Sequence, residues 1–398
     1  MSTRGRTLAG MGLLAWAVGL SWAEPAPPAA PAPPKAGAPA VKSVSGPFTH
    51  GNLTVFLLHG PDVLAGKDIL TLQDALAQKK AVVHETSNVN NLSVENTSED
   101  AIVFIQSGDI VKGGKQDRAI AFDLLLPPKS GLVSIGSFCC ESGRWTKRGQ
   151  EAADYFAESN AQIAGKDLKA AVVGNDASKQ GEVWQKVGET QQKLSRNVGK
   201  PVADPASPKS LQLTLENKQL QEKVTAYETA LAGCVADRKD VIGVALVVNG
   251  KVEGAEVYGS AALFGKLWPK TLKAAATDAL AQLDEKKPFD PAPAKAVEAF
   301  LADAAAGPAK EVPMPSTVVR AGAGRGAQTA NAAAEGRQVA ANAAGPAAPA
   351  AQPPARVRIV RYDGSKVLLV ESQDKEKSAV IHRCYIAKDP PKEEPKKP

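Results

Sequence analysis

VIGVALVVNGKVEGAEVY, residues 241–258, carries the strongest hairpin signal in this sequence of 398 residues. Two runs rich in valine flank the dipeptide Asn249-Gly250. A two-residue type I′ turn needs positive φ at both central positions, and Asn followed by Gly suits that turn. The stretch therefore predicts a β-hairpin with strands over residues 241–248 and 251–258.

Strand-like segments also dominate the sequence that precedes this hairpin. In one of them, over residues 119–126, Ile120, Phe122, Leu124 and Leu126 alternate onto a single face. Glycine and proline pairs between the segments are typical of tight turns, so an antiparallel meander is the simplest topology. The predicted strands of this part cover residues 53–58, 81–85, 92–96, 101–105, 119–126 and 131–140.

Helical patterns lie mainly in the second half of the chain. Thr71 is expected to cap a short earlier helix, with Asp74 at its third position. A later helix contains Pro269, which is expected to kink it, and Asp363-Gly364 predicts a second hairpin. The fold class is therefore α+β, with helices packed on mainly antiparallel sheets. The predicted helices cover residues 71–78, 179–194, 210–232 and 260–283.

The composition divides the chain into folded and low-complexity parts. It is 43% hydrophobic but only 5% aromatic, with 34 Gly and 29 Pro, and much of the apolar fraction is Ala in Pro/Ala tracts that build no core. We expect a signal peptide (1–23), an Ala/Pro-rich tether (24–45), an α+β domain (46–286), a Pro/Ala/Gly-rich insertion that is disordered or weakly helical (287–355), returning strands of the domain (356–387) and a charged tail (388–398).

The N-terminus has the pattern of a secretory signal. Arg4 and Arg6 precede an apolar run, and Ser21 and Ala23 are small residues at the positions that a signal peptidase recognises. We expect cleavage after Ala23, export to the periplasm or the extracellular space, and no stable membrane span in the mature chain. The alternative is an uncleaved anchor, for which the apolar run is short.

Charge and residue counts exclude several classes of function. The 48 Lys and Arg and 42 Asp and Glu leave a net charge of +6, which is too mild and too evenly interleaved for nucleic-acid binding. The 4 cysteines are too few for a disulfide-built scaffold. The 4 histidines lack the spacing of metal ligands, so neither a metal nor a cofactor is indicated.

Two polar segments, residues 112–118 and 139–145, carry the candidate site. If the strands that they border pair as a hairpin, residues 118 and 140 fall at the same end of the sheet. Guanidinium groups bind carboxylates or phosphates, an amide offers donors and acceptors, and an indole supplies a stacking face. The predicted ligand-binding residues are Gln116, Arg118, Glu141, Arg144 and Trp145.

A structural role for the same residues is equally compatible with the sequence. In that case an arginine pairs with Glu141, and Trp145 closes the end of the core. Weaker candidates for catalysis are Glu141 or Glu85 as a general base and Cys140 as a nucleophile, although no histidine lies close to Cys140 in sequence.

Seven segments of the sequence carry a resemblance: LTLQDAL (70–76), VHE (83–85), GGKQDR (113–118), CESGRW (140–145), QGEVW (180–184), 242–258 and FGKLW (264–268). Together they resemble a known family, the ARG and rhodanese-phosphatase-superfamily-associated protein domain family of prokaryotes. The resemblance spans about residues 46–286, and its name implies an association with ADP-ribosylglycohydrolases and thus with ADP-ribose or NAD-derived chemistry. By matching position it implies the site residues Glu85, Gln116, Arg118, Glu141, Arg144 and Trp145, with Cys140 besides.

Three functions follow as expectations. The first is an exported ligand-binding or interaction domain for a small anionic or nucleotide-like ligand, or for an envelope protein as partner. The second is a hydrolase in which a Glu acts as general base and the arginines hold the anion, which requires a carboxylate of raised pKa in a cleft. The third is an inert structural protein of the envelope, positioned by its Pro/Ala tethers.

Overall fold

A computed structural model describes residues 41–64, 66–159, 162–173, 176–284, 286, 288–313, 357–375 and 379–389. The predicted signal peptide, most of the tether, most of the Pro/Ala/Gly-rich insertion and nearly all of the charged tail lie outside the described residues. None of the described helices combines the length and the apolar character needed to cross a membrane.

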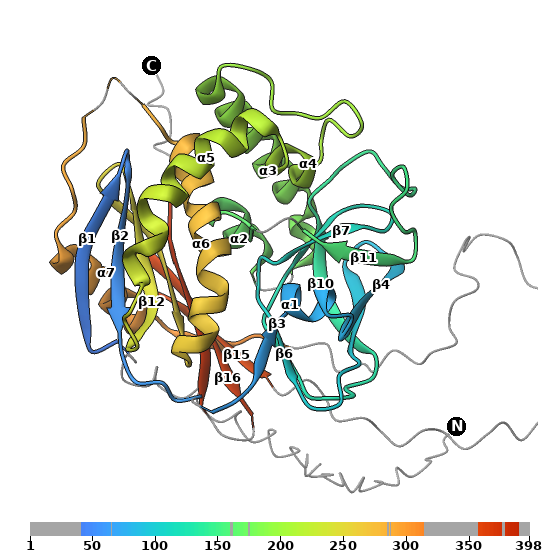
Figure 1. Cartoon of the computed structure of the whole chain (residues 1–398), viewed down its shortest axis with the longest axis horizontal. Helices are drawn as coiled ribbons and strands as arrows, with labels where there is room; N and C mark the ends of the chain where they lie inside the picture. The colour runs from blue at the N-terminus through green and yellow to red at the C-terminus, as the bar shows by residue number, and fades with distance from the viewer. Residues whose placement is uncertain are drawn as a thin grey trace, which may run out of the picture. The chain divides into compact units, whose positions relative to one another are not determined.

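The hairpin at residues 241–258 forms the centre of an eight-stranded sheet (Figure 1). Asn249 and Gly250 have φ values of 49° and 74°, so the predicted turn geometry is confirmed. Every neighbouring pair in this sheet is antiparallel. In spatial order the strands are β1 (Ser43–His50), β2 (Leu53–His59), β12 (Val241–Val248), β13 (Lys251–Tyr258), β17 (Val380–Ala387), β16 (Val367–Asp374), β15 (Val357–Asp363) and β14 (Ala309–Glu311).

Helices cover both faces of this sheet, because its central strands are apolar on both sides. In β2, Leu53, Val55 and Leu57 join one hydrophobic cluster and Phe56 and Leu58 join another. The long helix α6 (Ala261–Ala281) packs on the first face with α5 (Lys218–Leu231) beside it, and α7 (Ala294–Ala306) packs on the second (Figure 1).

The second sheet system is a closed six-stranded barrel with the strand order β10-β5-β4-β11-β7-β8. A small sheet, β3-β6-β9, lies beside it and contains one parallel pair, β3 with β6. The bounds are β3 (Ile69–Thr71), β4 (Ala81–Asn88), β5 (Asn91–Asn96), β6 (Ile102–Ile105), β7 (Ile110–Gly113), β8 (Arg118–Ile120), β9 (Leu124–Leu126), β10 (Val133–Cys139) and β11 (Tyr155–Glu158). The fold class is α+β with mostly antiparallel strands, as predicted.

The single strand predicted over residues 119–126 is wrong, because the chain leaves the barrel in its middle. β8 pairs with β10, whereas β9 pairs with β6 in the small sheet. Asp123 lies between the two strands, and its carboxylate accepts a hydrogen bond from the Ser107 amide at 2.7 Å. The buried Asp123 thus divides a segment whose alternating apolar residues predict a single strand. As a result, the strands form a barrel with a small separate sheet instead of a simple meander.

The helices agree with the prediction in position more closely than in extent. The capping box of Thr71 and Asp74 at α1 (Leu72–Ala77) is confirmed. The helix predicted over residues 210–232 is divided, because Asn217 caps a new start by accepting a hydrogen bond from the Leu220 amide. The remaining helices are α2 (Lys166–Val172), α3 (Gln180–Val198), α4 (Leu211–Leu215) and the short 3-10 turns Ala177–Lys179 and Ala232–Val235.

Part of the predicted low-complexity insertion belongs to the fold. Helix α7 and strand β14 both fall within residues 287–355. Val297 and Leu301 of α7 are buried against the eight-stranded sheet, and β14 pairs with β15 at its edge. Two apolar residues one helical turn apart are sufficient to bury this helix, although its composition is dominated by alanine.

Candidate functional site

The predicted pairing of the strands that carry the two polar segments is confirmed. β8 and β10 are antiparallel, with Arg118 opposite Cys139. The segments 112–118 and 139–145 therefore meet at one end of the barrel. Of the predicted ligand-binding residues, Gln116, Arg118 and Glu141 are buried, and Trp145 is 42% exposed.

Two of the predicted residues belong to a closed carboxylate–arginine cluster, which consists of Asp117, Glu141, Arg144 and Arg148. Arg144 binds Glu141 in a bidentate manner, with Nε to Oε1 at 2.7 Å and Nη2 to Oε2 at 2.6 Å. Arg148 binds both oxygens of Asp117 at 3.0 Å. The Asp117 amide also donates to Glu141, and Arg144 donates to the Gly114 carbonyl. Both acidic side chains have no exposed surface.

This cluster is satisfied by its own members and their neighbours. Burial alone raises the pKa of Glu141, but hydrogen bonds from Arg144 and Ser207 and from the Asp117 amide outweigh burial and hold the pKa below its ordinary value. Glu141 therefore does not have the raised pKa that a general base in this position requires. The geometry of Glu141 and Arg144 is that of a buried ion pair that fixes the loop after β10.

Arg118, Trp145 and Glu85 form a separate group beside the cluster. The Arg118 guanidinium lies 5.7 Å from the centre of the Trp145 ring, and Nη2 lies 3.6 Å from Glu85 Oε2. Arg118 Nη1 donates to the Gln116 carbonyl oxygen at 2.8 Å, so the contact involves the backbone of Gln116. The barrel end thus brings together all five predicted ligand-binding residues, but in two arrangements of different chemistry.

The cysteines do not have the environment of a nucleophile. Burial raises the pKa of Cys139 to about 11 and raises that of Cys140 as well, so both stay protonated at neutral pH. Gln180 of α3 holds the Cys139 backbone at both its amide and its carbonyl, each at 2.9 Å. Cys139, Cys140, Cys234 and Cys384 are all free thiols.

A hollow lined by many charged residues lies on the eight-stranded sheet side, and sequence reasoning missed it. This lysine groove has a volume of about 720 Å³. Its acidic residues gather around one lysine, since Lys166 Nζ lies 2.7 Å from Glu253, 3.1 Å from Asp389 and 3.7 Å from Asp167. The charged residues that line it are Lys166, Lys186, Lys193, Lys251, Lys366, Lys388, Asp167, Glu253 and Asp389.

Two lysines of the groove form no close ion pair, although the charge of Lys366 helps to lower the pKa of Asp303. Among the described residues no ion pair involves Lys251 or Lys366, and both side chains are exposed. Six lysines against three acids leave an excess of three positive charges on the lining. Three of the other lysines have acidic neighbours, because Lys193 lies 3.9 Å from Asp167, Lys186 lies 3.4 Å from Glu189 and Lys388 contacts Asp363. The unpaired positive charge of the groove therefore lies on Lys251 and Lys366. A concave surface with such an excess attracts anions.

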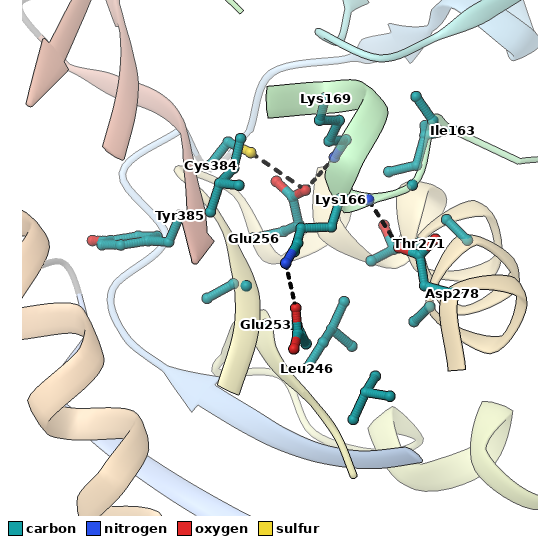
Figure 2. Close-up of a pocket in the computed structure, with 18 residues that line it drawn as sticks. Ile163, Lys166, Lys169, Leu246, Glu253, Glu256, Thr271, Asp278, Cys384 and Tyr385 are labelled. Atoms are coloured by element: carbon teal, nitrogen blue, oxygen red, sulfur yellow. Dashed lines mark hydrogen bonds and ion pairs between the residues drawn. The ribbon is translucent and has the colours of Figure 1, made fainter. Parts of the chain in front are cut away.

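A smaller inner pocket adjoins the groove at Lys166 and is shown in Figure 2. Its volume of about 50 Å³ holds a few water molecules. The Lys166 amide, at the first position of α2, donates to Asp278 Oδ2 of α6 at 2.8 Å. A side chain at Gly165 would collide with this carboxylate, because a Cβ built there lies 2.2 Å from Asp278 Oδ1.

Asp278 has the perturbed acidity that Glu141 lacks. Burial raises the pKa of Asp278 to about 7, and the nearby carboxylates of Asp167 and Glu253 add to the rise. The hydrogen bond from the Lys166 amide opposes it. Asp278 is therefore partly protonated near neutral pH at the boundary between the inner pocket and the outer surface.

A chain of buried charged side chains leads inward from the same pocket. Lys169 contacts Glu256 Oε1, and Glu256 Oε2 lies 2.7 Å from His382 Nε2 (Figure 2 shows the first pair). His382 Nδ1 lies 2.8 Å from Asp123 Oδ2. Burial lowers the pKa of His382, but the two carboxylates outweigh burial and raise it to about 9. The chain joins α2, β13 and β17 of the sheet side to the segment between β8 and β9.

No sequence motif indicated the lysine groove or the chain of buried charged side chains. The six lysines lie on five different parts of the chain, between residues 166 and 388, since Lys186 and Lys193 share helix α3. Only the spacing of Lys186 and Lys193, two turns apart, places two of them near one another in the sequence. Within the described residues, no three side chains of His, Cys, Asp or Glu are grouped as a metal site requires.

Comparison with known proteins gives a single match. A family model described as the ARG and Rhodanese-Phosphatase-superfamily-associated Protein domain matches residues 42–344. No curated protein and no solved structure matches the chain. The matched range includes the barrel, helix α6 and the groove lysines up to Lys251. It ends before strands β15, β16 and β17.

Proposed function

This chain belongs to the ARG and Rhodanese-Phosphatase-superfamily-associated Protein domain family, and from that premise we propose that it binds a small anionic ligand in the lysine groove. The observation that carries the proposal is the excess of lysine over acidic residues around one hollow. Phosphate esters and nucleoside diphosphates, with ADP-ribose as a derivative of the latter, are the first ligands to test. Each carries negative charge that several lysines can contact together.

The size of the groove suits such a ligand. Small-molecule sites enclose about 300–1,000 Å³, and the volume of the groove, about 720 Å³, falls in that range. Val248, Val252 and Phe300 add apolar surface next to the lysines. A ligand with a charged part and a flat or apolar part can therefore contact both kinds of surface.

The first test is a pair of double variants with equal loss of charge. In Lys251→Gln/Lys366→Gln the two unpaired lysines of the groove are neutralised, whereas Lys218→Gln/Lys223→Gln removes two exposed lysines of α5. Exposed charge pairs contribute about 0.2–1 kcal/mol each, so we expect the loss of two to weaken the binding of ADP-ribose or pyrophosphate by the groove variant about 2–30-fold. The α5 variant should bind like the unmodified protein, measured by thermal shift at low salt.

Equal weakening in both double variants would mean that only the net charge of the protein attracts the anion. Absence of any thermal shift with phosphates, nucleotides or ADP-ribose in the unmodified protein would contradict ligand binding in the groove altogether.

Hydrolysis of the bound anion is the second candidate function, and Asp278 is the observation that favours it. A general base works best when its pKa lies near the operating pH, and the pKa of Asp278 is raised to about 7. This carboxylate has the raised pKa that Glu141, a base expected from the sequence, lacks. A phosphate monoester assay should then give a rate that rises through pH 7 in the unmodified protein and loses this rise in Asp278→Asn.

Export of the protein stays part of the proposal. It rests on the apolar run after Arg4 and Arg6 and on the small residues before Glu24. In the periplasm or outside the cell, the groove would meet extracellular phosphates or the anionic groups of the envelope. A structural role in the envelope is the alternative that applies if no ligand binds, and the closed carboxylate–arginine cluster is compatible with it.

A further inference from the structure

Arg118 differs from the two other arginines at the barrel end in one respect. Its side chain has no exposed surface, yet its Nε and Nη2 groups have no hydrogen-bond partner. Only Nη1 is used, toward the Gln116 carbonyl. Buried donors without partners cost about 1–3 kcal/mol each, and in native proteins such groups call for an explanation, a bound ion or water among them.

The two unused groups lie on the same edge of the guanidinium. Arg144 lies four residues after Cys140 and uses the same edge of its guanidinium. Its Nε and Nη2 groups both donate to Glu141. The corresponding edge of Arg118 has the same geometry, because Nε–H and Nη2–H of any arginine form a fork that matches two oxygens of a carboxylate or phosphate. The protein thus contains one filled fork and one unfilled fork at the same barrel end.

The nearest carboxylate does not fill the fork of Arg118. Glu85 Oε2 lies 3.6 Å from Nη2, beyond hydrogen-bond distance, and Oε1 and Oε2 already accept hydrogen bonds from the Ser87 and Lys115 amides at 2.7 Å and 3.0 Å. Glu85 is held in place by these backbone groups. It supplies a negative charge near the guanidinium without the bidentate contact.

Trp145 lies over the same guanidinium and is the exposed member of the group. Its ring lies 5.7 Å from Arg118 and 5.3 Å from Lys115 Nζ, and 42% of the residue is exposed. The neighbouring Arg144 and Arg148 hold the loop in place by their ion pairs. A cation–π contact at an exposed site contributes about 0.5–1 kcal/mol, which a stronger interaction can replace.

We infer that Arg118, Lys115 and Trp145 form a second ligand site, distinct from the lysine groove, which takes a small oxyanion on the free edge of the Arg118 guanidinium. The ligand class is a carboxylate or a phosphate with two oxygens on one side. Lys115 adds a second positive charge, and the Trp145 ring moves aside or stacks on a flat ligand. This inference does not rest on the proposed function of the groove.

The test is a titration of the full protein with inorganic phosphate and, separately, with benzoate, at constant ionic strength, while the arginine Nε–H signals are followed by NMR. Arg118→Lys keeps the charge and removes the fork, so the missing signal identifies Arg118. We expect that signal to shift with at least one of the two anions and the signal of Arg144 to stay unchanged. The anion with the larger effect identifies the ligand as a phosphate or a carboxylate.

Glu85→Gln separates a ligand site from a structural pair. Removing the nearby negative charge should strengthen anion binding at least threefold, whereas the surface change Arg358→Lys should leave it unaltered. The groove variant Lys251→Gln/Lys366→Gln should also bind at this site unchanged, so failure of either site is seen separately. If neither anion moves the Arg118 signal in the unmodified protein or in Glu85→Gln, the inference is overturned. Because these two proteins keep Arg118, a folding defect in Arg118→Lys does not affect this outcome.

Discussion

At the scale of single residues, the protein buries an unusual number of charged side chains and satisfies most of them in connected groups. Asp117, Glu141, Glu256 and His382 all have exposures below 9%, and each contacts an opposite charge. Buried pairs of this kind add little net stability compared with apolar residues, but loss of one partner is costly. Their effect is to fix specific contacts between elements that lie far apart in the sequence.

The acidity of His382 predicts how stability depends on pH. Its pKa in the folded protein is about 9, above the ordinary 6.5, so protonated His382 stabilises the folded state. This contribution is complete below pH 6.5 and is lost as the pH rises through 9. It amounts to about 3 kcal/mol at most. Urea unfolding between pH 6 and pH 9.5 should show a fall in the free energy of unfolding that is smaller in His382→Gln.

The same variant should be less stable at pH 6, because Asp123 and Glu256 lose the cation between them. If the free energy of unfolding depended on pH equally in the unmodified protein and in His382→Gln, His382 would not carry the charge assigned to it.

At the scale of elements, the sequence predicts those features that depend on interactions between residues close together in the chain. The hairpin at residues 241–258, the cap of α1 and the register of β8 against β10 depend on turn geometry, short hydrogen bonds and pairing that the sequence makes visible. The two strands within residues 119–126 were not separated, because a contact of Asp123 with Ser107 and His382 decides that break. Helix α7 was missed for a similar reason, since its burial against the sheet outweighs its alanine-rich composition.

The turn of the central hairpin gives a prediction at this scale. Gly250 has φ 74°, and a Cβ added there would lie 2.3 Å from the Asp290 carbonyl oxygen. Gly250→Ala should therefore lower the free energy of unfolding by about 1–3 kcal/mol. The control is Gly181→Ala in helix α3, where no atom lies within 4 Å of an added Cβ. There a gain of up to about 1 kcal/mol is expected. Similar effects at both sites, measured by urea unfolding, would contradict the assigned turn.

At the scale of the whole molecule, the candidate sites differ in how far the sequence could predict them. The barrel-end residues lie in two segments about 25 residues apart whose strands pair directly, so Gln116, Arg118, Glu141, Arg144 and Trp145 could be grouped in advance. Which arginine pairs with which carboxylate depends on side-chain packing and could not. The lysine groove combines α2, α3, β13 and the ends of β16 and β17, and only the assembled fold brings these together.

The N-terminal prediction also belongs to this scale. We expect the exported protein to begin at Glu24, since the signal pattern ends at Ala23. Edman sequencing or mass spectrometry of the protein from the periplasmic or extracellular fraction measures this directly. A chain in the soluble fraction that still begins with Met1 would contradict the prediction.

Anion binding in the lysine groove is the central claim, and calorimetric titration of the purified protein with pyrophosphate tests it most directly. The account predicts saturable binding at low salt that weakens as salt screens the lysines. Lys251→Gln/Lys366→Gln should bind about 2–30-fold more weakly, and Lys218→Gln/Lys223→Gln should bind like the unmodified protein. Binding of equal strength in all three proteins, or no binding in any of them, would contradict it.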